Sequence, residues 1–153
     1  MNSRFTMAVH LLGMLTWAQR SGMGPLTSER AAESINTSPV VIRRLVAMLH
    51  AQGMVEARKG PNGGIQLARE PEKITLREVY EAVSEDAPVL GGYTAKPGAK
   101  CPVAPYVAEY LEGLRNRAEE AMKAQLDMVT IQQMTSEIIA RVRKSGKCKE
   151  HIS

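Results

Sequence analysis

The chain has 153 residues, of which 44 % are hydrophobic and only 4 % aromatic, so its core must be built mainly from aliphatic side chains and methionine. Its two cysteines, Cys101 and Cys148, are too few and too far apart for a disulfide framework or a zinc-binding spacing. No apolar run approaches the roughly 18 residues that span a membrane, and no signal peptide is visible. We therefore expect a soluble, cytoplasmic protein.

The net charge of +4 is unevenly distributed along the chain. Residues 1–70 hold eight Lys or Arg against four Asp or Glu, whereas residues 71–153 hold twelve of each kind. The positive excess therefore lies in the N-terminal half, as expected for a module that faces nucleic-acid phosphates. Charge of this size alone is also common in proteins without a nucleic-acid partner.

Residues 3–18 predict an amphipathic first helix, because apolar side chains recur there at helical spacing. These side chains are Phe5, Ala8, Val9, Leu12 and Leu15. The segment from Gly22 to Pro25 ends this helix. Thr27 or Ser28 then predicts the N-cap of a short helix that reaches about Ile35, and Asn36-Thr37 predicts a turn.

A third helix is predicted to begin at Ser38-Pro39, with Ser38 as its N-cap, and to end at Gly53. Helical spacing places Arg43 and Arg44 on or near its outer face, together with Ala47. The side chains expected to face inward are Val41, Leu45, Met48 and Leu49.

Two short β segments, Met54–Arg58 and Gly64–Ala68, flank a tip that contains Pro61 and the pair Asn62-Gly63. This is the usual chemistry of a hairpin. A helix, a turn, a second helix and a hairpin in this order predict a winged helix-turn-helix. Thr75 and Glu78 predict a capping box for a fourth helix from Leu76 to about Ser84, and residues 88–100 should form a loop.

Residues 102–145 predict one long helix, because Tyr106–Lys144 contains no proline and a single glycine. Over Tyr106–Lys144 such a helix would be about 58 Å long at 1.5 Å per residue. Its apolar stripe includes Val107, Leu111 and Leu114 and drifts before it resumes at Met134. A second copy of the same helix is the simplest partner for this stripe. The alternative is a broken helix that folds back onto its own domain.

These elements resemble the IscR/CymR/NsrR/BadM-type regulators, the Rrf family of winged helix-turn-helix transcription factors. The resemblance is dense over residues 1–85 and looser through Cys101-Pro102 and the long helix. The matching residues are Arg4-Phe5, Ala8–Leu12, Thr27-Ser28, Ala31, Val41–Leu45, Gly53–Val55, Gly60–Gly64, Leu67-Ala68, Ile74–Leu76, Val79 and Ala82-Val83.

The resemblance implies a mainly α fold with a small β-hairpin wing and a long C-terminal dimerisation helix. It implies that the recognition helix enters the major groove, which makes Ser38, Val40, Arg43 and Arg44 candidate contacts. The wing would reach the minor groove through Arg58 and Lys59. Arginine can bind guanine bidentately or pair with phosphate, which fits these roles. The alternative is that these cations only solvate the surface.

The sensor region departs from the iron–sulfur members of the family, which carry three cysteines before the long helix. Here that loop holds only Cys101, and Ala104 stands where one branch has a histidine. One thiolate cannot replace four cluster ligands, so we expect neither an iron–sulfur cluster nor another metal. Cys101 is either a redox-sensing thiol near a helix N-terminus or a small packed side chain. Cys148 lies in a polar tail.

The expected organisation is a DNA-binding domain over residues 1–86, a connecting or sensor loop over 87–101, a dimerisation helix over 102–145 and a tail over 146–153. The expected function is a sequence-specific regulator, a repressor, that binds double-stranded operator DNA as a homodimer and responds to thiol redox state. The alternative is a regulator that docks a metabolic enzyme or signalling partner. An enzyme that uses Cys101 is disfavoured, because none of the three histidines has an obvious relation to it.

Overall fold

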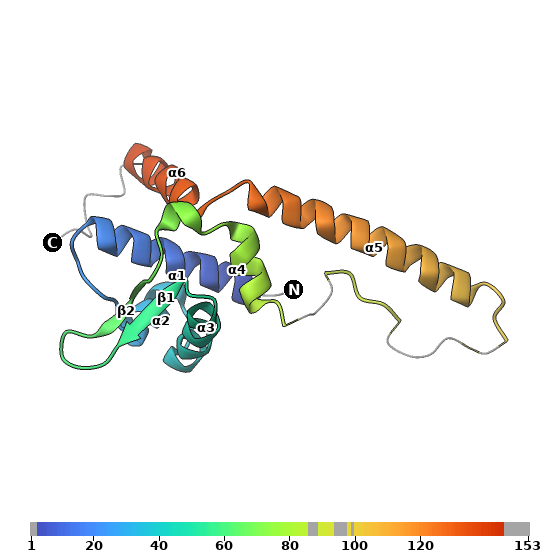
Figure 1. Ribbon diagram of the computed structural model, residues 1–153, viewed down its shortest axis with the longest axis horizontal. Coiled ribbons are helices and arrows are strands. Elements are labelled where there is room, and N and C mark those ends of the chain that lie inside the picture. The colour runs from blue at the N-terminus through green and yellow to red at the C-terminus, as the bar shows by residue number, and fades with distance from the viewer. Residues whose placement is uncertain (1–2, 86–88, 94–97, 99, 146–153) are drawn as a thin grey trace.

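The computed structural model describes residues 3–85, 89–93, 98 and 100–145. Figure 1 shows a body of short helices with a two-stranded hairpin, from which one long helix projects. In chain order the elements are α1 (Ser3–Arg20), α2 (Ser28–Ile35), α3 (Pro39–Ala51), β1 (Val55–Arg58), β2 (Gly64–Leu67), the 3₁₀ turn η1 (Pro71–Lys73), α4 (Leu76–Val83), α5 (Ala104–Asp127) and α6 (Ile131–Lys144). A mainly α fold with a hairpin wing is confirmed.

The helix-turn-helix forms as the capping residues predict. The Thr27 hydroxyl oxygen accepts the N–H of Arg30 at 3.2 Å and opens α2. Asn36 adopts the left-handed conformation, with φ 57° and ψ 56°, and so turns the chain between α2 and α3. The Ser38 hydroxyl oxygen then accepts the N–H of Val41 at 3.4 Å, with Pro39 as the first residue of α3.

The hairpin pairs β1 with β2 in antiparallel register, with Glu56 opposite Gln66. A bridge between Leu26 and Ile65 ties β2 to the segment before α2. Both predicted β segments are confirmed to within one residue at each end. The wing is therefore attached through β2 to the segment that leads into the helix-turn-helix.

The core gathers around α1, which buries Ala8, Leu11, Leu12 and Leu15. The predicted inward face of α3 needs correction, because the sequence pattern omitted two residues. Its fully buried side chains are Ile42, Leu45, Val46 and Leu49, whereas Val41 and Met48 are only half-buried. The reason is that α3 packs against α2, α4 and β1 at once, so its buried face is wider than one helical stripe.

A single helix over residues 102–145 is wrong. The helix ends at Asp127, and α6 begins at Ile131 after a break at Met128–Thr130. The break is not caused by a proline, because Met128–Thr130 contains none. Thr130 is an N-cap whose hydroxyl oxygen accepts the N–H of Gln133, while the Gln133 side chain accepts the N–H of Thr130. The alternative prediction, a broken helix that folds back onto its own domain, is thus correct for the C-terminal part of the segment, α6.

A second capping box, at Thr75 and Glu78, opens α4 as predicted. The two N-caps lie side by side, because Thr75 and Thr130 form an antiparallel bridge. The N–H of Leu76 donates to the Val129 carbonyl oxygen, and the N–H of Ile131 donates to the Ile74 carbonyl oxygen, both at 2.9 Å. The chain therefore returns to the body beside the point where α4 begins.

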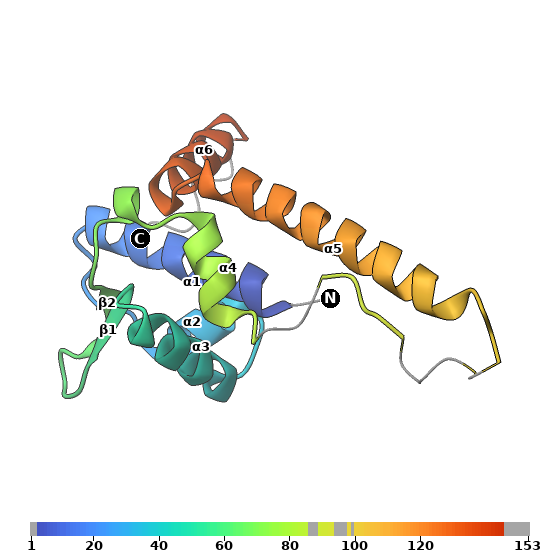
Figure 2. The same cartoon turned by 45° about the vertical axis from the view of Figure 1, so that its right-hand side comes forward.

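Helix α6 packs on α1, as Figure 2 shows from a second angle. Ile131 and Thr135 are buried in this contact. Gly13 of α1 allows the close approach, because a Cβ there would lie only 3.3 Å from Cε of Met134. The C-terminal helix is therefore part of the body rather than a continuation of α5.

Helix α5 stands away from the body, and its C-terminal part contacts α4 (Figures 1 and 2). Val89–Tyr93, in the segment predicted as a loop, contains no helix or strand. The predicted tail with Cys148 lies outside the described residues. Within the described ranges, no helix is long and apolar enough to cross a membrane.

Candidate nucleic-acid interface

Helix α3 and the hairpin lie on one side of the body, opposite α6. Figures 1 and 2 both place α3 and the wing below α1, while α6 lies above it. The predicted contacts of the recognition helix and of the wing therefore reach the same side of the molecule.

The recognition helix presents its predicted contact residues at its N-terminal half. Val40 is 54 % exposed, and the side chains of Arg43 and Arg44 are also exposed. Ser38 is exposed too, but its oxygen already caps α3. It can still donate its hydroxyl hydrogen to a phosphate or a base. Val40 offers a methyl surface of the kind that contacts the thymine methyl group.

Arg43 and Arg44 differ in their surroundings, which the sequence did not reveal. Nη2 of Arg43 donates to Oε1 of Glu29 in α2 at 2.8 Å, with 59 % and 64 % of the two side chains exposed. Within the described residues, Arg44 makes no ion pair or side-chain hydrogen bond. Arg43 is thus bound to a residue of the preceding helix, whereas its neighbour Arg44 is exposed to solvent.

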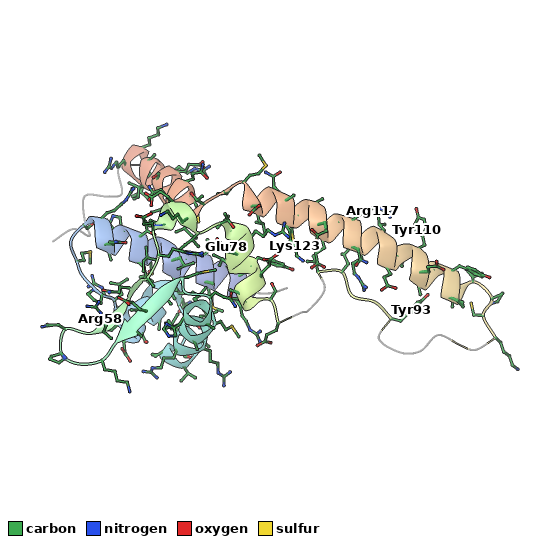
Figure 3. All side chains as sticks on the ribbon, in the orientation of Figure 1. Arg58, Glu78, Tyr93, Tyr110, Arg117 and Lys123 are labelled. Atoms are coloured by element: carbon green, nitrogen blue, oxygen red, sulfur yellow. The ribbon has the colours of Figure 1, made fainter. Side chains whose placement is uncertain are left out.

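The wing repeats this arrangement. Nη2 of Arg58 donates to Oε1 of Glu56 at 3.2 Å, and Nε2 of Gln66 donates to the same carboxylate oxygen. Gln66 can do so because the hairpin register sets it opposite Glu56. Figure 3 shows Arg58 on the strand just before the wing loop. Lys59, the next residue, is exposed and has no ion-pair partner in the parts of the chain that are described.

We call Arg43 and Arg58 the held arginines, and Arg44 and Lys59 the free cations. Sequence reasoning found all four residues but missed Glu29, Glu56 and Gln66, which hold two of them. Glu29 lies 14 residues before Arg43, so no local spacing rule connects the two. The Glu56–Gln66 pair follows from the hairpin register and could have been found by placing the turn.

The predicted dimer-interface residues lie on α5 as an exposed apolar stripe. Leu111 is 53 % exposed, and Val107 and Leu114 are also exposed. Of the described residues of α5, only Ala104 is fully buried. The pattern extends beyond the predicted set to further exposed apolar or aromatic side chains, namely Val103, Tyr106 and Tyr110. A row of exposed apolar side chains like this is typical of a surface that contacts another protein.

Helix α5 is joined to α4 by charged side chains. Nζ of Lys123 pairs with Glu119 at 3.0 Å and with Glu120 at 3.6 Å, and Nη2 of Arg77 on α4 reaches Glu120 at 3.9 Å. The hydrogen bond from Lys123 to Glu119 raises the pKa of Lys123 above its usual value, and nearby carboxylates add to the effect while burial opposes it. Figure 3 shows Lys123 on the side of α5 near the body.

Cys101 lies three residues before α5 and is exposed, so a packed side chain does not describe it in the single chain. Its N–H donates to the Gly98 carbonyl oxygen at 3.0 Å. In the described ranges, no three His, Cys, Asp or Glu side chains come together as a metal ion would need. An iron–sulfur cluster normally takes four protein ligands, and Cys101 is the one cysteine among the described residues.

The histidines have other surroundings. Nδ1 of His50 lies 3.0 Å from the carbonyl oxygen of Val55, which joins the end of α3 to β1. His10 is exposed on α1, and His151 lies outside the described residues. Neither described histidine forms a hydrogen bond with Cys101.

Comparison with known proteins agrees with this geometry. The family model described as Rrf2, iron-dependent transcriptional regulator, matches residues 1–137. YwnA of Bacillus subtilis, which carries the name of an HTH-type transcriptional regulator, is 31 % identical over 125 residues, covering 82 % of this chain and 89 % of its own. The HTH-type transcriptional regulator IscR of Cereibacter sphaeroides is 31 % identical over 126 residues, covering 82 % and 77 %.

Among solved structures, CymR of B. subtilis, described as the global cysteine regulator, has the same fold. It superposes with a TM-score of 0.62 at 20 % identity, over 90 % of this chain and 96 % of that one. The span of the family model, residues 1–137, includes the helix-turn-helix, the wing and α5. The chain therefore belongs to the Rrf2 family of winged-helix transcriptional regulators, and it is a DNA-binding regulator.

Proposed function

We propose that the protein acts as a homodimeric repressor that binds an operator with two copies of α3 and two wings. The observation that carries this proposal is the exposed stripe on α5, which lies apart from the side of the body that bears α3 and the wing. A second α5 packed on this stripe would leave both DNA-binding sides free. Two recognition helices would then reach half-sites about one helical turn apart.

Within this dimer, Arg43 and Arg44 would bind the major groove, with Ser38 and Val40 beside them. Arg58 and Lys59 would reach the adjacent minor groove or its phosphates. Occupancy of the operator by two such units would block access to the DNA, which is why we propose repression. Because its target is DNA, we propose that the protein works in the cytoplasm and has no enzymatic activity.

The signal proposed here is oxidation of Cys101 rather than a change in an iron–sulfur cluster. Its thiol is exposed in the segment that leads into α5. A polar or bulky group at this position would lie where the chain enters the dimer helix. A change there can alter the spacing of two recognition helices without touching them.

Selection of bound sequences from random duplex DNA tests this function directly. Purified protein should enrich a sequence with two inverted half-sites about one helical turn apart, and a thiol oxidant should weaken the enrichment. Enrichment of a single half-site would contradict the dimer. No enrichment at physiological salt would contradict operator binding.

A further inference from the structure

We propose that Glu29 and Glu56 are positioning residues for sequence readout. They orient the held arginines, Arg43 and Arg58, so that these bind base edges or enter the groove. The free cations, Arg44 and Lys59, bind phosphates instead. This inference rests on the proposed roles of α3 and the wing in DNA binding. It adds two acidic residues that determine specificity rather than affinity.

The Glu29–Arg43 pair joins α2 to α3 at 2.8 Å, and both side chains are largely exposed, so the pair contributes little to folding. Its main effect is on conformation, because it keeps the Arg43 side chain near one position above the surface of α3. A guanidinium that is already positioned loses less conformational freedom when it binds a base.

Arg43 has enough N–H donors to bind Glu29 and a base at the same time. The guanidinium carries five N–H donors in a planar fork, and Glu29 accepts at one oxygen from Nη2. The remaining donors can still present two parallel hydrogen bonds to O6 and N7 of guanine. A lysine in the same place would have no such fork, so an acidic partner suits an arginine that reads a base.

The charge of Glu29 also affects which groups of the DNA Arg43 prefers. A carboxylate beside the cation repels phosphate, which every DNA sequence offers, and so weakens a sequence-independent contact of Arg43. A guanine offers two acceptors at a fixed position and compensates for this repulsion. Glu29 therefore acts against wrong sequences, which is how specificity often arises.

The wing provides the same arrangement independently. Glu56 accepts from Arg58 at 3.2 Å and also from Gln66, so the carboxylate is itself fixed by the opposite strand. It is the less exposed partner, with 39 % of its side chain accessible against 67 % for Arg58. In both elements, the cation that follows the held arginine has no ion-pair partner among the described residues.

The test compares Glu29→Gln with Glu33→Gln, which removes the same charge from the same helix. Glu33 is exposed and, within the described ranges, forms no ion pair. Each variant is titrated against the selected operator, all of its single-base-pair variants and an unselected duplex, at several salt concentrations. Arg43→Ala is included to identify the base pairs that Arg43 reads.

We expect Arg43→Ala to reduce discrimination at these base pairs by roughly five- to 100-fold. Glu29→Gln should reduce discrimination at the same base pairs, while its binding to the unselected duplex and its salt dependence both increase. In the Arg43→Ala background, Glu29→Gln should have no further effect on discrimination. Glu33→Gln should keep the wild-type pattern. In the wing, Glu56→Gln and Arg58→Ala should both reduce discrimination at the same base pairs, which flank those read by α3.

Equal discrimination profiles for Glu29→Gln and Glu33→Gln would overturn the inference. So would a Glu29→Gln variant that binds every duplex more tightly by the same factor, since Glu29 would then only compete with DNA. If Arg43→Ala itself left discrimination unchanged, the proposed contact of α3 with bases would be wrong. The two failures are therefore distinguishable.

Discussion

The N–H of Leu26 donates to the carbonyl oxygen of Ile65 at 2.9 Å, and the N–H of Ile65 donates to the carbonyl oxygen of Leu26 at 2.7 Å. Leu26 immediately precedes the N-cap of α2, and Ile65 lies in the second strand of the wing. Both side chains are buried in the core. The wing and the helix-turn-helix are thus linked by backbone bonds, and they should move on DNA as one unit.

Gly64 is essential for this link. It adopts φ +146°, and a Cβ there would lie 2.8 Å from the carbonyl oxygen of Leu26. Gly64→Ala should lower the free energy of unfolding by about 1–3 kcal/mol, measured by thermal denaturation. Gly91→Ala is the control, because a Cβ at Gly91 meets nothing within 4 Å. Equal melting temperatures for the two variants would contradict the proposed strain.

The double change Arg43→Ala, Arg44→Ala should weaken operator binding strongly and leave the fold intact. Each good bidentate base contact contributes about 1–3 kcal/mol, and loss of a phosphate contact adds to it. Fluorescence anisotropy with labelled operator measures the affinity, and circular dichroism checks the helices. Unchanged affinity would remove α3 from the proposed interface.

Lys59→Ala should behave differently, because we propose that Lys59 contacts phosphate rather than a base. Binding should weaken by a similar factor on all duplexes, and the slope of log K against log salt should fall by about one unit. Lys73→Ala, in η1, removes the same charge elsewhere and should leave the slope unchanged. A loss confined to the operator would instead indicate that Lys59 reads sequence.

The double change Leu111→Glu, Leu114→Glu should produce monomers, because two charges on the α5 stripe would have to be desolvated in a dimer. Sedimentation equilibrium measures this directly. Operator affinity should fall as well, since one recognition helix reaches only one half-site. Met23→Glu, an exposed residue between α1 and α2, is the control and should remain dimeric. Monomeric wild-type protein would favour a different protein partner for the stripe.

Protein purified without oxygen should contain no stoichiometric iron, and peroxide should weaken DNA binding through Cys101. The thiol sulfur takes one peroxide oxygen to form sulfenic acid, and water is released. Anisotropy titrations with increasing peroxide should show a response in the wild type and in Cys148→Ser but not in Cys101→Ser. Brown protein with bound iron would refute the expected absence of a cluster. Identical titration curves for wild type and Cys101→Ser would refute the role of Cys101 in the peroxide response.

The N-terminal elements could be predicted from sequence because their signals are local. Thr27, Ser38 and Thr75 cap helices through residues three positions away, and the wing turn contains Asn62-Gly63. The inward face of α3 was less predictable. Ile42 and Val46 are buried because three other elements surround α3, and a single helical stripe does not contain that information.

The break before α6 had a local signal in the sequence, but the lack of proline led to the prediction of one continuous helix. Thr130 and Gln133 have capping-box spacing, and the apolar pattern drifts just before them. The Glu29–Arg43 pair had no such signal, because it depends on how α2 and α3 pack. The cations of the candidate site can thus be found in the sequence, and Glu56 could be placed from the hairpin register. The contact of Glu29 with Arg43 requires the tertiary structure.

The bridge between Thr75 and Thr130 brings the start of α4 next to the start of α6, so the segment between α4 and α6 begins and ends on the same part of the body. The chain between the end of α4 and the start of α6 leaves the body and returns beside the point where α4 begins. We expect changes in the length or composition of this segment to leave the packing of α1, α3 and the wing intact, as long as the part of α5 that packs on α4 is kept. A different segment could therefore be grafted between these two attachment points, with the helix-turn-helix and the wing unchanged.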